Sequence, residues 1–156
     1  MRLLFVFVFL SSVAFGQNVY IPDANFKKYL VKNAKINTNG DSEIQLSEAK
    51  SYSGAIDCSN RSIQDLKGIE AFTTLTSLNC RQNGLNLKSI DVSKNTALTE
   101  LNCSLNLTLN TLDISKNTAL TRLNCSYTRL ASLDVSKNTA LTSLDCRATK
   151  LITSLD

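Results

Sequence analysis

Residues 98–119 read LTELNCSLNLTLNTLDISKNTA, and close copies of this phrase lie on both sides of it. The copy before it, residues 75–97, reads LTSLNCRQNGLNLKSIDVSKNTA, and the copy after it, residues 120–140, reads LTRLNCSYTRLASLDVSKNTA. A fourth copy begins at Leu141, and a weaker first copy begins near Ala55. Repetition with a period of about 20–29 residues predicts a solenoid in which each copy forms one coil.

One cysteine in each copy marks the period. The intervals between these cysteines are 22, 23, 22 and 21 residues: Cys58, Cys80, Cys103, Cys125 and Cys146. Because side chains alternate along a strand, each cysteine shares a face with the apolar residue two positions earlier. A single copy cannot bury these side chains, so we expect the copies to stack about 4.8 Å apart and close a core between them.

The repeated phrase resembles the leucine-rich repeat, whose pattern is L-x-x-L-x-L-x-x-N/C-x-L. In one copy the pattern is filled in order by Leu75, Leu78, Cys80, Asn83 and Leu85. The resemblance covers residues 54–156, with the last repeat incomplete. It implies an α/β repeat fold, a leucine-rich-repeat solenoid with a parallel β-sheet on its concave face and short strands and 3₁₀ turns on its convex face. The segment LDVSKNTALT, residues 133–142, is similar to segments of secreted repeat proteins of the Bacteroidetes type.

Two further features of the repeats carry predictions. The Ser-Lys-Asn-Thr segment of each full copy predicts a tight turn with its asparagine in the left-handed backbone region. The cysteines allow two interpretations, since disulfides are common in exported proteins. Their odd number and shared inward position favour free thiols packed as small apolar side chains, and a linear column does not surround a zinc ion.

The first 16 residues have the pattern of a signal peptide. Arg2 precedes an apolar run at residues 3–10, and small residues lead to a cleavage site after Gly16. The run is shorter than the roughly 20 residues that span a bilayer, although an uncleaved anchor stays an alternative. The pattern predicts a secreted or outer-surface protein with no membrane insertion after cleavage. The incomplete last repeat leaves open whether the chain is a fragment of a longer protein.

The composition argues against an enzyme. The sequence has no histidine, the usual activating base for a serine or cysteine nucleophile. Its net charge of +4 falls to +3 once the signal peptide and Arg2 are removed, and this charge is spread along the chain. A weak and dispersed positive charge does not predict nucleic-acid binding.

Residues 17–53 differ from the repeats and are expected to form a helical N-terminal cap, with a helix from Asp23 to about Lys32. Residues 37–48 resemble a twelve-residue EF-hand loop, a calcium-binding turn. The resemblance implies that five residues would bind the ion, Glu43 through its backbone carbonyl and the others through their side chains. These residues are Asn37, Asn39, Asp41, Glu43 and Glu48. The loop has Asn at its first position and no Gly at its sixth. Two interpretations remain open: one calcium ion bound with modest affinity, or a turn that binds none.

The outward residues of the predicted strands form columns on the concave face, which solenoids use for binding. Arginine, tyrosine and charged residues in these columns and the adjoining turns are the candidate binding residues: Arg81, Glu100, Arg122, Tyr127 and Arg147. We therefore predict a non-catalytic module that recognises a protein or a surface glycan. The alternative is a structural spacer or adhesin segment of a larger envelope protein.

Overall fold

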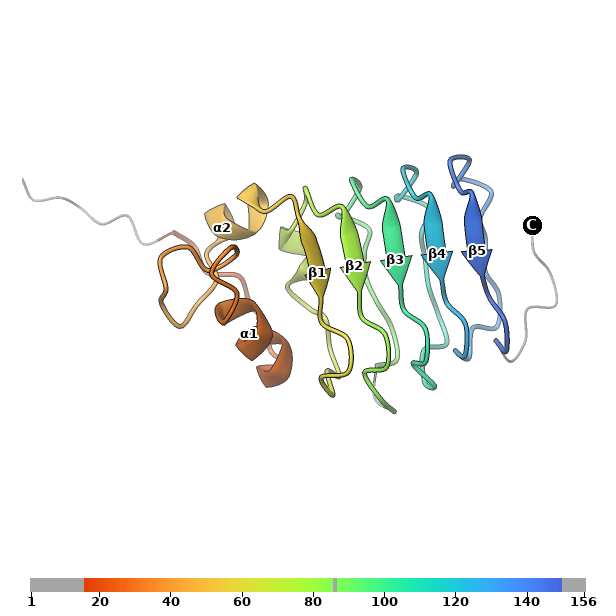
Figure 1. The fold of residues 1–156 in the computed structure, drawn as a ribbon, viewed down its shortest axis with the longest axis horizontal. Helices are drawn as coiled ribbons and strands as arrows, with labels where there is room; N and C mark the ends of the chain where they lie inside the picture. Colours follow the sequence, from red (N-terminus) through yellow and green to blue (C-terminus); the bar gives the residue numbers. More distant parts are fainter. Residues whose placement is uncertain (1–15, 86, 150–156) are drawn as a thin grey trace, which may run out of the picture.

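The computed structural model describes residues 16–85 and 87–149, and it shows a solenoid of parallel coils (Figure 1). Each coil contributes one short strand to a single five-stranded parallel sheet in the order β1-β2-β3-β4-β5. The strands are β1 (Ala55–Asp57), β2 (Ser77–Asn79), β3 (Glu100–Asn102), β4 (Arg122–Asn124) and β5 (Ser143–Asp145). The predicted leucine-rich-repeat architecture is confirmed.

The sheet register stacks the central residue of every strand into one apolar column. The paired residues are Ile56, Leu78, Leu101, Leu123 and Leu144. The first four are buried, and Leu144 packs partly exposed against the same core. Burying apolar surface is the main term that stabilises such a stack, because each coil covers the inner face of its neighbour.

The cysteines form a second column beside the first, and all five thiols are free. Four are buried, whereas Cys146 is partly exposed. The thiols of Cys80 and Cys103 point at backbone oxygens of the next coil, with a sulfur–oxygen distance of 3.5 Å in both cases. Burial raises the pKa of Cys58 and of Cys125 to about 12, so these thiols act as small apolar side chains.

Buried asparagines, Asn83 and Asn106, satisfy the backbone where the chain leaves β2 and β3. The amide nitrogen of Asn106 donates to the carbonyl oxygens of Cys80 and Cys103, at 3.0 and 2.8 Å. Its Oδ1 accepts the backbone N–H of Asn83 at 2.9 Å. The next coil has Thr128 at this position, and its hydroxyl donates only to the Cys125 carbonyl, at 2.7 Å. The side-chain ladder is therefore weaker toward the C-terminal coils.

A second ladder of asparagines lies on the opposite side of the coil and corrects one sequence prediction. The asparagine of each Ser-Lys-Asn-Thr segment is buried: Asn95, Asn117 and Asn138. None of the three has a positive φ. Their amide groups donate to carbonyls of the preceding coil, as Asn117 does to Val92 and Asn95 at 2.9 Å each. Hydrogen bonding between neighbouring coils therefore explains why each of these copies has an asparagine at this position.

Differences in coil length arise in a single turn. From the buried leucine after this turn to the next cysteine there are 16 residues in each case: Leu87 to Cys103, Leu109 to Cys125, and Leu130 to Cys146. The extra residues of the longer coils lie before that leucine. The sequence prediction that Leu85 fills a core position is wrong, because Leu87 is buried there and Leu85 is exposed. Gly84, with φ 93°, helps the lengthened turn swing outward.

The N-terminal cap contains two helices, α1 (Ala24–Val31) and α2 (Leu46–Ser51). Asp23 caps α1 by accepting the Phe26 N–H at 2.8 Å, as the sequence indicates. The other Asp23 oxygen accepts the N–H of Gln64 in the first coil at 2.8 Å, which ties the cap to the repeats. The short helix α2 was not predicted, and the 3₁₀ helix η1 (Ile69–Ala71) lies on the far side of the first full coil.

Two predictions concern the ends of the chain. The predicted signal peptide lies outside the described residues except for Gly16, and so does the end of the incomplete last repeat, residues 150–156. Within the part of the chain that the structure describes, no helix has both the length and the apolar character needed to cross a bilayer.

Candidate functional site

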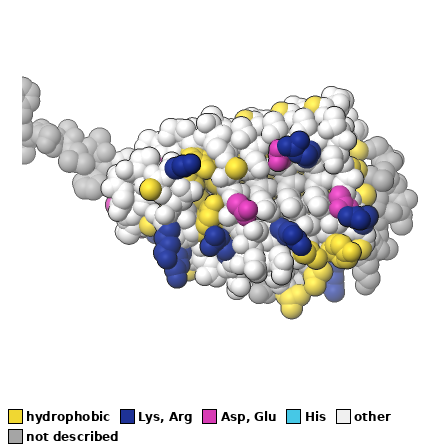
Figure 2. Space-filling view, viewed as in Figure 1, with side chains coloured by type: hydrophobic (Ala, Val, Ile, Leu, Met, Phe, Trp, Pro, Cys, Tyr) yellow, Lys and Arg dark blue, Asp and Glu magenta, His cyan; other side chains and the backbone are white. Residues whose placement is uncertain are grey.

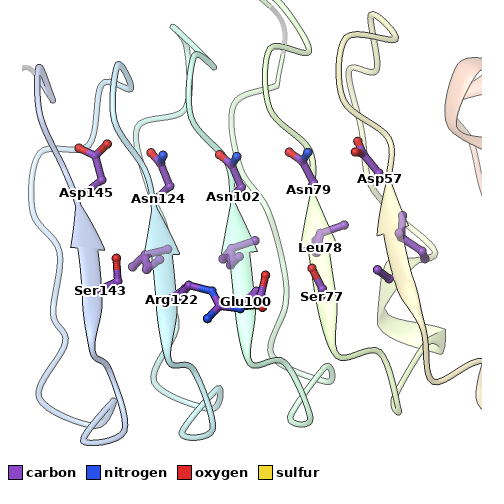
Figure 3. Close-up of a pocket in the computed structure, with 14 residues that line it drawn as sticks. Asp57, Ser77, Leu78, Asn79, Glu100, Asn102, Arg122, Asn124, Ser143 and Asp145 are labelled. Carbon is purple, nitrogen blue, oxygen red and sulfur yellow. Dashed lines mark hydrogen bonds and ion pairs between the residues drawn. The ribbon is translucent and has the colours of Figure 1, made fainter.

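A shallow groove of about 530 Å³ runs across the sheet on the concave face, lined by residues of all five strands (Figure 3). Its floor is the row of outward side chains on either side of the central apolar column. Glu100 and Arg122 lie in this groove on neighbouring strands, as the sequence predicts, and they form an ion pair. The structure therefore provides a continuous surface that crosses five coils.

One row of the groove consists of amide and carboxylate side chains at matching positions: Asp57, Asn79, Asn102, Asn124 and Asp145 (Figure 3). The Oδ1 of each accepts the backbone N–H two residues later, as Asn124 does from Ser126 at 3.0 Å. This bond is an Asx turn, and it fixes the side chain while the rest of the head group faces the groove. The recurring Asn-Cys-Ser segment was the signal for this arrangement.

The two predicted arginines at the turns differ in their surroundings. The Arg147 guanidinium makes two bonds to the Asp145 carboxylate, each 2.9 Å long. Hydrogen bonds from the Arg147 side chain and backbone lower the pKa of Asp145. Arg81 is exposed, and no carboxylate among the described residues forms an ion pair with it. Arg81 is thus available to an acidic partner.

The predicted binding residues separate into two surfaces. Glu100 and Arg122 face the groove. Arg81, Tyr127 and Arg147 lie in the turns that follow the C-terminal ends of β2, β4 and β5. We call these turns the turn edge: residues 81–89 without residue 86, 104–110, 126–132 and 147–149. Figure 2 shows hydrophobic and basic side chains side by side there, below the sheet.

Sequence reasoning missed two residues of the turn edge. Leu85 is 65% exposed and Leu107 is 46% exposed, next to Tyr127 at 50%. Both leucines lie in the lengthened turns, so a leucine pattern alone assigns them to the core. The signal that could have found them is the number of residues from the cysteine of each coil to the next buried leucine. This number is larger in these two coils than in the coil that contains Cys125 and Leu130.

The turn edge also holds bulky residues in the left-handed backbone region. Leu105 has φ 57° and Tyr127 has φ 55°, at equivalent positions of neighbouring coils. This geometry lets the N–H of Tyr127 reach the carbonyl of Arg147 in the next coil, at 2.9 Å. The left-handed region costs a residue with a Cβ about 1–2 kcal/mol, and glycine or asparagine adopts it more readily. Fold geometry requires the conformation but not these side chains.

The EF-hand-like loop at residues 37–48 is held together by its own side chains. Glu48 is buried, and its Oε1 accepts the N–H groups of Thr38 and Asn39, at 2.7 and 3.2 Å. Its Oε2 accepts the N–H of Gln45 at 3.0 Å, and Asn37 Oδ1 accepts the N–H of Gly40 at 3.1 Å. The predicted ligand atoms thus bond to the loop backbone.

The remaining predicted ligands are engaged as well. Asp41 accepts the Glu43 N–H at 2.7 Å and two side-chain amides, and Asn39 Oδ1 accepts the N–H of Asp41 at 2.9 Å. The Glu43 carboxylate, which is not the predicted ligand atom of this residue, pairs with Lys27 of α1 at 2.5 Å. Hydrogen bonds lower the pKa of Asp41, and the bond from the Glu43 N–H contributes most. Hard oxygen atoms are present, and Glu48 would have to leave three N–H groups to bind an ion.

The structure does not assemble an acidic or sulfur-rich metal cluster elsewhere in the described residues. No three histidine, cysteine, aspartate or glutamate side chains gather closely enough there to hold an ion. The groove therefore offers hydrogen-bonding groups and one ion pair across neighbouring strands, a surface suited to recognition.

Comparison with known proteins agrees with this geometry. Internalin J of Listeria monocytogenes serotype 4b is 39% identical over 80 residues, which are 51% of this chain and 8% of that protein. A solved structure described as the functional domain of InlJ from Listeria monocytogenes, which includes a cysteine ladder, has a TM-score of 0.58 and 35% identity. The match covers 90% of this chain and 35% of that one.

A second solved structure, an internalin (inlF) from Listeria monocytogenes, has a TM-score of 0.55 and 20% identity. It covers 90% of this chain and 48% of that one, and at this identity it supports the fold alone. The chain thus spans less than half of the internalin chains that it matches. The model of the leucine-rich-repeat domain of endo-beta-N-acetylglucosaminidase EndoS matches residues 38–148. Because that match covers well over half of the sequence, the chain belongs to this family of leucine-rich-repeat domains.

Proposed function

We propose that this domain is a non-catalytic binding module that recognises a protein on the concave face of its sheet. The observation that carries the proposal is the groove, which runs across all five strands and holds an aligned row of amides with an ion pair beside it. Extended concave surfaces of this kind are what solenoid proteins use to bind partners. Similarity to internalin J and to the functional domain of InlJ supports the same role.

A protein partner is favoured over a surface glycan, which is the second candidate ligand. The groove holds fixed hydrogen-bonding groups, but no aromatic side chain is among its lining residues. A purely structural role as a spacer or adhesin segment is the alternative from a different class. The exposed tyrosine and arginines beside the groove favour binding, because these residue types dominate interface energetics.

We also propose that the domain works outside the cell, either secreted or on the outer surface. The support is the sequence pattern of residues 1–16, and the likeness to secreted Bacteroidetes-type repeat proteins agrees with it. Free thiols fit this location because four of the five are buried in the coil core, where they pack as small apolar side chains.

Binding of the full chain to intact bacterial and animal cell surfaces tests the main proposal. We expect saturable binding that is lost when the surfaces are treated with protease and kept when they are treated with glycosidases. Arg122→Glu is expected to weaken binding at least tenfold, about 1.4 kcal/mol, because it places two carboxylates side by side in the groove. The melting temperature should change little, since an exposed ion pair contributes about 0–1 kcal/mol.

Lys116→Glu is the matched control, because this residue is exposed and lies outside the groove. It makes the same charge change and should leave binding within twofold. Loss of binding after glycosidase treatment alone would support a glycan ligand. Absence of saturable binding to any surface would support the spacer role.

Calcium binding by the loop at residues 37–48 is a separate proposal, with a Kd of about 10⁻⁴–10⁻³ M. Since an ion that binds only the folded state stabilises it, about 5 mM calcium should raise the melting temperature by a few degrees over EDTA. Asp41→Asn keeps a side-chain acceptor but removes one of the two ligand charges, so it should abolish most of this increase. Equal melting temperatures in calcium and EDTA for the unchanged chain would contradict the proposal.

A further inference from the structure

We infer that the turn edge is a second interaction surface, beside the groove, and that it docks an acidic protein segment carrying apolar side chains. This inference rests on the proposed function in one respect, namely that the partner is a protein. Its surface is distinct, since no residue of the turn edge lines the groove. The two surfaces can therefore be tested separately.

The first support is the concentration of exposed apolar side chains on this edge. Among the described residues of the repeats, all of the exposed large hydrophobic residues lie there: Leu85, Leu107 and Tyr127. Hydrogen bonds between coils hold their turns side by side, from Thr108 Oγ1 to the Leu87 carbonyl at 3.0 Å and from the Arg129 N–H to the Leu109 carbonyl at 2.8 Å. A row of exposed apolar side chains marks an interaction site more often than isolated ones do.

The second support is the placement of the extra residues. The three coils that follow Cys80 keep a constant 16-residue span from the buried leucine to the next cysteine and differ in length only in the preceding turn. These additional residues display Leu85 and Leu107 outward rather than filling the core. Core packing therefore does not account for the apolar character of the longer turns.

The third support is that two bulky side chains occupy a backbone conformation that is unfavourable for them. The residue two positions after the cysteine is left-handed in all five coils, and Tyr127 and Leu105 are the bulky apolar residues there, where glycine or asparagine would be favoured. Residues held in such sparsely populated backbone regions cluster at functional sites. Tyr127 is half exposed, so its ring is retained there without serving the core.

Charge defines the partner. The four turn-edge segments contain no aspartate or glutamate and include Arg81, Lys88, Arg129 and Arg147. Among the described residues, only Arg147 of these four takes part in an ion pair. A planar guanidinium binds carboxylates through two hydrogen bonds, so arginines beside tyrosine and leucine fit a segment that alternates acidic and apolar residues.

Two other anionic partners fit less well. An anionic membrane is recognised by clusters of about 4–8 lysines and arginines close together, whereas these cations are spread over three coils. Single-stranded nucleic acid is bound through several stacking rings, and the turn edge has only Tyr127 among its described residues.

The test measures binding of a labelled twelve-residue peptide, with alternating glutamate and leucine or phenylalanine, to the full chain by fluorescence anisotropy. We expect saturable binding that weakens at least tenfold in the double variant Tyr127→Asn, Arg129→Glu. Asparagine tolerates the left-handed backbone, so the folded state should be kept and the melting temperature should not fall. Leu107→Asn alone should weaken binding about threefold.

Arg122→Glu serves as the groove control and should leave peptide binding within twofold, as should Lys116→Glu. If cell-surface binding is lost in Arg122→Glu but the peptide still binds, both surfaces act as proposed. The inference is overturned if the edge variants bind the peptide unchanged, or if a peptide with lysine in place of glutamate binds equally well. It is also overturned if phosphatidylserine vesicles or single-stranded DNA bind this edge and the peptide does not.

Discussion

Replacing Asn106 by alanine is expected to lower the free energy of unfolding by about 3 kcal/mol, because it leaves two buried backbone groups without partners and removes one of the two partners of a third. The N–H of Asn83 and the carbonyl of Cys103 lose their partner, whereas the carbonyl of Cys80 keeps its bond from the Asn83 side chain. Water cannot reach the turn to replace the lost bonds, since Asn106 and both cysteines are buried. Urea unfolding followed by circular dichroism measures the change.

The next coil supplies a matched control for this variant. Thr128 occupies the equivalent position and bonds the Cys125 carbonyl, so Asn106→Thr should restore part of the lost stability. Asn110→Ala should change the unfolding free energy by less than about 0.5 kcal/mol, because Asn110 is exposed. If the alanine and threonine variants of Asn106 unfold at the same urea concentration, the buried hydrogen bonds do not have the role described.

Replacing Leu101 by alanine is expected to destabilise the domain by about 2–5 kcal/mol, the cost of a cavity in a packed core. Leu101 is 2% exposed and lies between Leu78 and Leu123 in the apolar column. A cavity at this point removes contacts on both sides, because each coil packs against the coil before it and the coil after it. The midpoint of urea unfolding should fall clearly.

Two other leucines calibrate this result. Leu144 belongs to the same column but is partly buried, so Leu144→Ala should cost less than half as much. Leu107 is on the turn edge, and Leu107→Ala should leave the midpoint nearly unchanged. A Leu101→Ala midpoint no lower than that of Leu107→Ala would contradict the proposed core.

Much of the fold could be predicted because it depends on a repeat. Once Leu101 and Cys103 share a face, every copy repeats the arrangement, and the register of all five strands follows. The cap was harder, since α2 has six residues and its N-cap is Gln45, which is not among the strongest helix-capping residues. Its capping box, with Glu48 bonded to the Gln45 N–H, became apparent only from the structure.

The candidate site was predicted in part, for reasons that differ from residue to residue. Glu100 and Arg122 follow from strand register, so their meeting in the groove could be predicted. Leu85 was misassigned because its sequence position fits the leucine pattern, whereas burial depends on how many residues the turn accommodates. The asparagines of the Ser-Lys-Asn-Thr segments were misinterpreted because their partners lie in another coil, as Asn117 bonds Val92.

The way neighbouring coils pack has a consequence for how such a protein changes length during evolution. Each coil makes its contacts only with the coil on either side, so a duplicated copy inserts into the stack without altering the packing of the others. Every added copy lengthens the concave surface by one strand, about 4.8 Å. The size of the partner that the domain can accommodate is therefore adjusted by gene duplication, one coil at a time.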